Sequence, residues 1–198
     1  MKYVLLTLFI LIITLVLSQV YVVKSTTDTE STNYNTLKTF EGFEIREYPE
    51  LTVATTTVNR GNYNKNSRQG FGRIASYIFG GNSDNTQIAM TSPVQMDMDN
   101  DTTMSFFMPS NIKFDELPIP NNSSVRIQQM SAKVVAVVSF DGWASDEILD
   151  QKFTQLKILL SNEGIDFEDN YSYLGYNPPY QLINRKNEVL INLKNFKS

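Results

Sequence analysis

The sequence contains neither cysteine nor histidine. Without cysteine it has no disulfide framework, no thiolate nucleophile, no zinc knuckle and no iron–sulfur centre. Without histidine it lacks the commonest general base, and also the commonest protein ligand of transition metals and of haem iron. A Ser-His-Asp triad and a histidine-based metallohydrolase site are therefore excluded.

Positive charge is sparse as well. The 17 Lys and Arg residues are outnumbered by 21 Asp and Glu, the net charge is -4, and no run of Lys or Arg exceeds two residues. Nucleic-acid binding needs clustered positive charge, so we expect no nucleic-acid partner. Because 41% of the residues are hydrophobic and 12% are aromatic, the composition indicates a packed globular body.

The longest apolar run lies at the N-terminus. An uncharged stretch of 20 residues, from Val4 to Val23, matches the roughly 20 residues with which a helix crosses a bilayer. Residues 1–24 are therefore expected to be a membrane anchor, or a signal segment with a cleavage site near Ser18. Residues 25–36 have the polar, Ser/Thr-rich composition of a flexible tether. We expect a globular body over residues 37–198, outside the cytoplasm.

The body alternates short strand patterns with two helical patterns. The order strand-strand-helix-strand-strand occurs twice, over about residues 40–118 and 125–195. It predicts an α+β fold, a distorted antiparallel β-barrel of two similar halves with two helices. Strands are expected at residues 43–48, 51–58, 87–97, 104–109, 125–130, 133–140, 171–177 and 188–194, and helices at 67–81 and 145–164.

The first helical pattern is the best candidate for a binding surface. Its apolar residues follow the i, i+3, i+4, i+7 spacing of one helix face, and arginines stand beside them. Apolar surface next to guanidinium groups suits a flat apolar ligand with carboxylates, which Arg binds bidentately. The same pattern is typical of a plain core helix with solvated arginines. The apolar residues are Phe71, Ile74, Ala75 and Ile78, and the arginines are Arg68 and Arg73.

One segment imitates a metal site. Residues 97–101, "DMDND", resemble the opening of a calcium-binding loop. However, Thr102 stands where that loop needs Gly, and Met108 where it needs a bidentate Glu. We interpret the segment as a polar hairpin turn and expect no metal site.

Six segments, in order along the chain, resemble the SOUL haem-binding proteins. Together they cover nearly the whole body, which makes the resemblance specific. The segments are "GFEIREYP" (42–49), "QGFGRIASYIFGGNSDNTQIAMTSPV" (69–94), "MSFFMP" (104–109), "LPIPNNSSVRI" (117–127), "FDGW" (140–143) and "GYNPPYQLINRKNEVLI" (175–191).

The resemblance implies a barrel of two similar halves that binds haem or another tetrapyrrole non-covalently. It places the groove between the first helix and the loop at Pro178-Pro179. Arg68 stands at the position of a basic residue that meets a propionate, and relatives often carry Lys where this chain has Gln181. Members without an iron-bound histidine hold haem by contacts and propionates, and the His-free sequence fits that pattern. The implied apolar floor is Phe71, Ile74, Ala75 and Ile78, and the implied facing wall is Tyr180 and Gln181.

Three functions therefore remain open. The first is a membrane-tethered or exported haem-binding protein that buffers or transfers its ligand without catalysis. The second is a general effector-binding module for hydrophobic small molecules, of the gyrase-inhibitor-like type. The third, weaker reading is an enzyme that modifies tetrapyrroles with Tyr or Glu as the acid or base.

Overall fold

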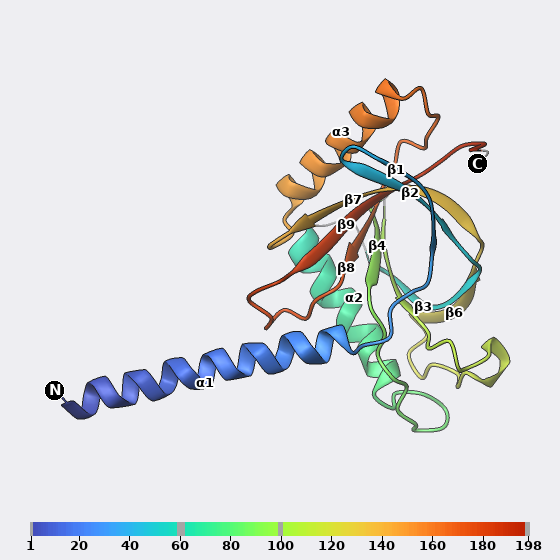
Figure 1. Cartoon of the computed structure of the whole chain (residues 1–198). Coiled ribbons are helices and arrows are strands. Elements are labelled where there is room, and N and C mark those ends of the chain that lie inside the picture. The colour runs from blue at the N-terminus through green and yellow to red at the C-terminus, as the bar shows by residue number, and fades with distance from the viewer. Residues whose placement is uncertain (1, 59–61, 99–100, 197–198) are drawn as a thin grey trace.

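The computed structural model describes residues 2–58, 62–98 and 101–196 (Figure 1). A long N-terminal helix precedes a curled sheet that carries two further helices. The elements are α1 (Lys2–Thr27), β1 (Asn35–Phe40), β2 (Phe43–Tyr48), β3 (Leu51–Val58), α2 (Tyr63–Ile78), β4 (Val94–Met98), β5 (Thr102–Phe107), the short 3-10 turn η1 (Phe114–Glu116), β6 (Val125–Met130), β7 (Lys133–Asp141), α3 (Asp146–Asn162), β8 (Ser172–Gly175) and β9 (Lys186–Asn192).

The strands form one antiparallel sheet in the order β1-β2-β7-β9-β8-β4-β5-β3-β6. When β1 is set aside, exchanging β2 with β6, β3 with β7, β4 with β8 and β5 with β9 gives the same order read backwards. The two halves meet where β4 pairs with β8, with Val94 opposite Gly175 and Met96 opposite Tyr173. The expected α+β distorted barrel of two similar halves is therefore confirmed.

The two body helices cover the same face of the sheet. The apolar side chains of α2 and α3 pack on alternate residues of the strands, such as Ala54 on β3 and Ala136 on β7. The intervening residues, such as Val53 and Val135, form a second apolar cluster on the inner face of the curl. Figure 1 shows the sheet curling away from the helices, so one sheet separates two cores.

The segment expected to be a flexible tether makes specific contacts with the body. Glu30 accepts a hydrogen bond from the backbone N–H of Ser110 through its carboxylate, at 2.9 Å, and Ser31 bridges to Ser92. The Tyr34 ring lies 5.4 Å from that of Tyr48. The segment then becomes β1, which pairs with β2 at the edge of the sheet.

The N-terminal helix α1 has the length and composition of a membrane span. It has 26 residues and a mean hydropathy of 2.5 in its most apolar window, and none of that window is buried in the body. The apolar residues of α1 are spread around the whole helix, whereas those of α2 and α3 lie mainly on one side. The helix α1 is thus apolar and contacts the body only at its C-terminal end (Figure 1).

The segment that imitates a calcium loop runs from the last two residues of β4 to the residue before β5, two strands that pair as a hairpin. Its central residues, Asp99 and Asn100, lie outside the described residues. Among the residues that are described, no group of three or more carboxylates is placed to hold a metal ion.

Candidate functional site

The candidate site is built on α2, whose inner face fixes its position on the sheet. The side chain of Asn62 caps the helix by accepting a hydrogen bond from the backbone N–H of Lys65 at 2.9 Å. Ile74 and Ile78 are 0% and 1% exposed. Gly70 permits a close approach to β5, because a Cβ atom there would lie 3.0 Å from the Met104 sulfur. One side of α2 is therefore fully used in packing.

A different side of α2 is open and contains part of the expected ligand surface. Arg68, Phe71, Gly72 and Ala75 follow i, i+3, i+4, i+7 spacing and so share a face. The Phe71 side chain is 37% exposed, with its ring 5.2 Å from that of Phe106. Gly72 has open space above it, so the helix backbone is bare at the centre of this face.

Basic charge gathers at the start of the same helix. Lys65 and Arg68 are exposed one turn apart, and α2 has no acidic residue in its own first turn. Among the described residues neither cation has an ion-pair partner. Both line a hollow of about 730 Å³ with Asn62 and Gln69. The hollow is thus an anion-attracting surface next to the apolar Phe71 edge.

Arg73, the other arginine beside the pattern, is already engaged. Its Nη1 donates a hydrogen bond to the carbonyl oxygen of Thr57 at 2.9 Å. Arg73 therefore secures the end of β3 against α2 rather than extending the basic surface.

The loop at Pro178-Pro179 is stiffened from within by Gln181 and Arg185. The amide of Gln181 donates to the carbonyl oxygens of Ile183 and Asn184, at 2.9 and 3.1 Å, and its side chain is buried. Arg185 donates to the carbonyl oxygens of Pro178 and Gln181, and its guanidinium lies 4.0 Å from the Trp143 ring centre. Sequence reasoning did not identify this support.

The expected site residues thus fall into three environments. Arg68, Phe71 and Tyr180 are exposed, whereas Ala75, at the edge of the open face of α2, is buried. Ile74 and Ile78, expected as part of the groove floor, lie beneath the helix against the sheet. Gln181, expected as a wall, points into its own loop.

A chain of aromatic hydroxyls links the first turn of α2 to the hairpin that carries the Pro-Pro loop. The Tyr63 hydroxyl lies 3.3 Å from that of Tyr173 on β8, which donates to Asn187 Oδ1 on β9 at 2.7 Å. Burial raises the pKa of Tyr173 well above its ordinary value, so this hydroxyl stays protonated. The start of α2 and the β8–β9 hairpin are therefore mechanically connected.

Two residues of the open face were missed in the sequence. Lys65 stands three positions before Arg68, which places both cations on neighbouring turns of one helix. Gly72 lies inside a helix, where glycine costs about 0.5–1 kcal/mol relative to alanine. Lys65 lies in the helix only because α2 begins at Tyr63, before the expected start at residue 67, whereas Gly72 lies within the expected helix.

The inner face of the curl carries a separate, closed network around Glu188, which is 0% exposed. Its carboxylate accepts hydrogen bonds from Arg46 Nη1 at 3.0 and 3.1 Å and from the Tyr176 hydroxyl at 2.7 Å, and Lys186 Nζ lies 3.0 Å away. Burial opposes ionisation, but Arg46 and Lys186 hold the pKa of Glu188 below its ordinary value. The Glu188 carboxylate is therefore paired within the protein and is not available to bind a ligand.

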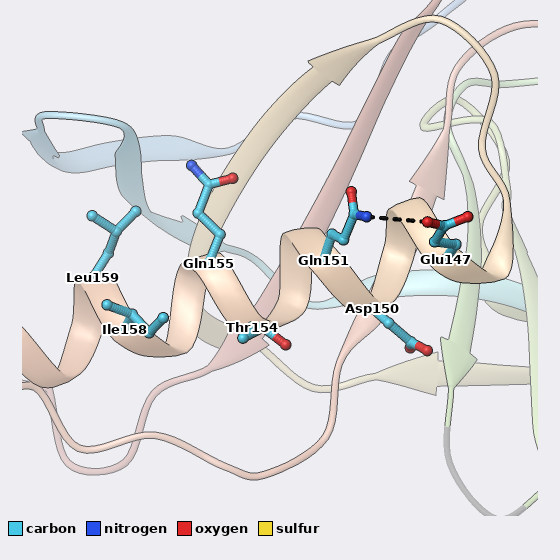
Figure 2. Close-up of a pocket in the computed structure, with 7 residues that line it drawn as sticks. All are labelled: Glu147, Asp150, Gln151, Thr154, Gln155, Ile158 and Leu159. Atoms are coloured by element: carbon cyan, nitrogen blue, oxygen red, sulfur yellow. Dashed lines mark hydrogen bonds between the residues drawn. The ribbon is translucent and has the colours of Figure 1, made fainter.

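A second hollow, of about 620 Å³, lies along the outer face of α3. Figure 2 shows its lining side chains on that single helix, with the Gln151 amide donating to Glu147. Its ionisable groups, Glu147 and Asp150, are both acidic, so it does not suit a ligand with carboxylates. The basic face of α2 remains the stronger candidate.

The duplicated half-barrel with one helix on each half defines a class of α+β barrels with solved examples. The chain superposes on the EcmrR C-terminal domain with a TM-score of 0.61 at 11% identity, covering 82% of this chain and 99% of that one. For a hydrolase from Listeria innocua the TM-score is 0.55 at 8% identity, covering 86% and 96%. These likenesses concern the fold alone.

The family model for the SOUL heme-binding protein matches residues 29–192, and the chain belongs to the SOUL heme-binding protein family. It is 33% identical to human "Heme-binding protein 2" over 162 residues, which cover 77% of this chain and 78% of that protein. It is 27% identical to Xenopus laevis "Heme-binding protein 1" over 155 residues, covering 74% and 81%. The family expected from the six motifs is confirmed.

Proposed function

We propose that the body of this protein binds haem or a related tetrapyrrole non-covalently on the open face of α2. The observation that carries the proposal is the basic pair Lys65 and Arg68, which has no ion-pair partner in the described part of the chain, beside the apolar edge at Phe71. Membership of a family whose relatives are named heme-binding proteins supports the same ligand. Because the chain has no cysteine, thioether attachment of the ring is excluded.

Each part of the face has a distinct role in this proposal. Arg68, with Lys65, binds propionate carboxylates, since guanidinium pairs with carboxylate bidentately. Phe71 and Gly72 support the flat ring, with the buried Ala75 at the edge of that surface, and the bare backbone at Gly72 lets the ring lie close to the helix. Tyr180 forms the facing wall, and Gln181 holds the loop that presents it. Ile74 and Ile78 hold α2 on the sheet from below.

Haem supplies an iron centre and a large apolar surface when bound, and the protein supplies contacts and charge. With no His or Cys in the sequence, the two commonest strong iron ligands are absent. We therefore propose binding, with buffering or transfer of the ligand, and no catalytic turnover.

We further propose that α1 is a membrane anchor, or a signal segment if it is cleaved, that places the body outside the cytoplasm. The support is the length and mean hydropathy of α1 and the absence of buried residues in it.

The ligand proposal is tested by titrating hemin into residues 28–198 and following the Soret absorbance. This fragment keeps every residue of both core clusters, the first of which is Tyr34. We expect a saturable shift, weakened about tenfold or more by Arg68→Glu, since charge-assisted hydrogen bonds contribute about 1.5–3 kcal/mol. Arg126→Glu is the matched control, because Arg126 is an exposed arginine on the opposite face of the sheet.

Gly72→Leu separates lost binding from lost folding. Leucine favours helix over glycine by nearly 1 kcal/mol, so the variant is expected to be at least as stable as the parent protein. Its side chain covers the bare face, so its affinity for hemin should fall. A parent fragment without a saturable shift would contradict the proposal. Stabilisation by other hydrophobic ligands but not hemin would favour a general effector module, and sustained consumption of bound haem would favour an enzyme.

A further inference from the structure

The last two turns of α1 touch the body along a single stripe. Gln19, Val22, Val23 and Thr26 are partly covered, at i, i+3, i+4 and i+7, whereas residues 2–18 are exposed. Figure 1 shows α1 extending away from the body, with only its C-terminal end next to it. The contact therefore fixes where along α1 the body begins.

The partner of this stripe is the loop between β8 and β9. Gln19 Nε2 donates to the carbonyl oxygen of Tyr180 at 3.3 Å, and Gln19 Oε1 accepts from the backbone N–H of Leu182 at 2.8 Å. About two turns later, Thr26 Oγ1 donates to Gln181 Oε1 at 2.8 Å. Both functional groups of the Gln19 amide are thus used to hold one loop.

The position of Gln19 sets the depth of that loop. The apolar run ends at Val23, and Gln19 lies four residues earlier, which is about 6 Å along a helix that rises ~1.5 Å per residue. An unpaired side-chain amide, and unpaired backbone groups, are costly at that depth in a bilayer. The hydrogen bonds between the Gln19 amide and the loop backbone remove both costs. They therefore explain why a polar residue occurs inside the apolar span.

The side chains of the loop suit a lipid surface. Tyr180, Leu182 and Ile183 are 64%, 51% and 51% exposed, and residues 177–184 carry no charge. Tyr21, near the end of the apolar run, is also exposed, at 74%. Tyrosine concentrates at membrane–water interfaces, where its ring meets lipid and its hydroxyl meets water. Exposed aliphatic side chains of this size gain free energy on leaving water.

We propose that residues 180–183 enter the interfacial region of the same bilayer that α1 spans, as a second membrane contact of the body. This inference rests on the proposed membrane insertion of α1. Two contacts, a spanning helix and an inserted loop, prevent the body from swinging freely on its anchor. They also place Tyr180, the facing wall of the proposed tetrapyrrole site, at the lipid surface, where an apolar ligand partitions.

The absence of cysteine allows a direct test in the full-length chain. Single variants Ile183→Cys, Ile10→Cys and Glu163→Cys are labelled with an environment-sensitive fluorophore and reconstituted in phosphatidylcholine vesicles. Ile10 lies within the apolar span, and Glu163 is an exposed residue just beyond α3. Quenching is measured with nitroxide-labelled lipids and with aqueous iodide.

We expect the label at position 183 to be quenched several-fold more by lipid nitroxide than the label at position 163, and several-fold less by iodide. Adding Gln19→Leu, which keeps the span apolar but removes the loop hydrogen bonds, should reduce the lipid quenching at position 183 and leave that at position 10 unchanged.

Lipid quenching at position 10 with iodide-accessible labels at both 183 and 163 would overturn the proposal. A chain without lipid quenching at any of the three positions would also overturn it, because α1 would not be inserted. Hemin binding by residues 28–198 does not depend on either result, so a failure of this inference is distinct from a failure of the proposed ligand.

Discussion

Glu188 shows how much of this fold depends on single buried charges. Its carboxylate joins β9 to β2 through Arg46, and it holds the Tyr176 hydroxyl on the residue that follows β8. The Arg46 guanidinium also lies 4.2 Å from the Tyr34 ring centre. Removing one partner of such a pair leaves an uncompensated charge in the interior, which typically costs 3–5 kcal/mol. The buried charges on the inner face of the curl therefore stabilise the fold only as a set, because each one compensates another.

This network predicts a loss of stability in acid. Because the pKa of Glu188 is held below its ordinary value, the carboxylate stabilises the folded state above the unfolded-state pKa of about 4.3. That contribution is lost as the pH falls from there through the folded-state pKa. Urea denaturation of residues 28–198 at a series of pH values measures it.

Glu188→Gln should be less stable than the parent at neutral pH, by about 3 kcal/mol, and should show a shallower decline below pH ~4.3. Glu44→Gln, which changes the more exposed acidic partner of Arg46, is the control and should retain the parent's decline. An unchanged decline in Glu188→Gln would show that other carboxylates dominate the acid limit.

Two glycines of α2 should respond oppositely to alanine. At Gly70 the new Cβ would meet Met104 at 3.0–3.3 Å, and we expect a net destabilisation of about 1 kcal/mol. At Gly72 nothing lies within 4 Å, so alanine should stabilise the helix by about 0.5–1 kcal/mol. Thermal denaturation compares the two variants. Equal shifts of the same sign would contradict the assigned faces of α2.

The roles of individual α2 residues could be predicted only in part. The apolar spacing of Phe71, Ile74, Ala75 and Ile78 correctly indicated a helix, but it did not reveal which edge of that stripe meets the sheet. The buried side also contains Asn66 and Gly70, a polar and a small residue that hydropathy does not mark as inward. Asn66 is buried because its amide donates to Thr102 Oγ1 at 2.7 Å, a contact between distant parts of the chain.

At the scale of elements, both body helices begin with an N-capping side chain, and their N-terminal ends are in contact. Asn62 caps α2 and Ser145 caps α3, each through its side-chain oxygen. Asp146, in the first turn of α3, accepts a hydrogen bond from the backbone N–H of Tyr63 at 2.9 Å. The caps therefore hold two equivalent helix ends, of which only that of α2 carries the proposed basic surface.

This equivalence provides a matched pair of variants. Asn62→Ala and Ser145→Ala should each cost about 1 kcal/mol of stability, because each removes one capping hydrogen bond. Only Asn62→Ala should weaken hemin binding, since it frays the turns that hold Lys65 and Arg68. Denaturation and Soret titration of both variants measure the two effects. Equal losses of hemin affinity would place the ligand away from the start of α2.

Strands with a buried alternating face were the predictable elements, and β1 was not among them. Its two apolar residues, Leu37 and Phe40, are three positions apart, which does not match the period of a strand. The register of β1 on β2 shifts between Thr36 and Lys38, and this irregularity accommodates the spacing. A pattern search with period two has no signal for such an edge strand.

At the scale of the whole molecule, the duplication explains why the fold was readable although the halves share little sequence. The repeated order of elements predicted two similar units. The pairing of β4 with β8 joins those units, and it depends on contacts between residues about 80 positions apart, which local patterns do not encode. The symmetry of the sheet is thus a property of the assembled chain, whereas its parts are visible in sequence.

The boundary of the folded body is the remaining question at this scale, and it makes the last prediction. The composition of residues 25–36 indicated a loose tether, whereas the structure ties residues 30–34 to the body through Glu30, Ser31 and Tyr34. Residues 28–198 should therefore be more stable than residues 37–198 by about 2 kcal/mol, because aromatic and cation–π contacts of Tyr34 contribute about 0.5–1.5 kcal/mol each.

Urea denaturation of the two fragments measures this difference. A Tyr34→Ala variant of 28–198 should reproduce most of the loss, since it removes the ring contacts that account for the difference but keeps the Glu30 and Ser31 contacts. If 37–198 proved as stable as 28–198, the segment would be a tether after all, and the body would be free to move relative to α1. If 28–198 is the more stable fragment, residues 28–36 form a short, structured connection. The proposed attachment of the body to a membrane by both a helix and a loop requires such a connection.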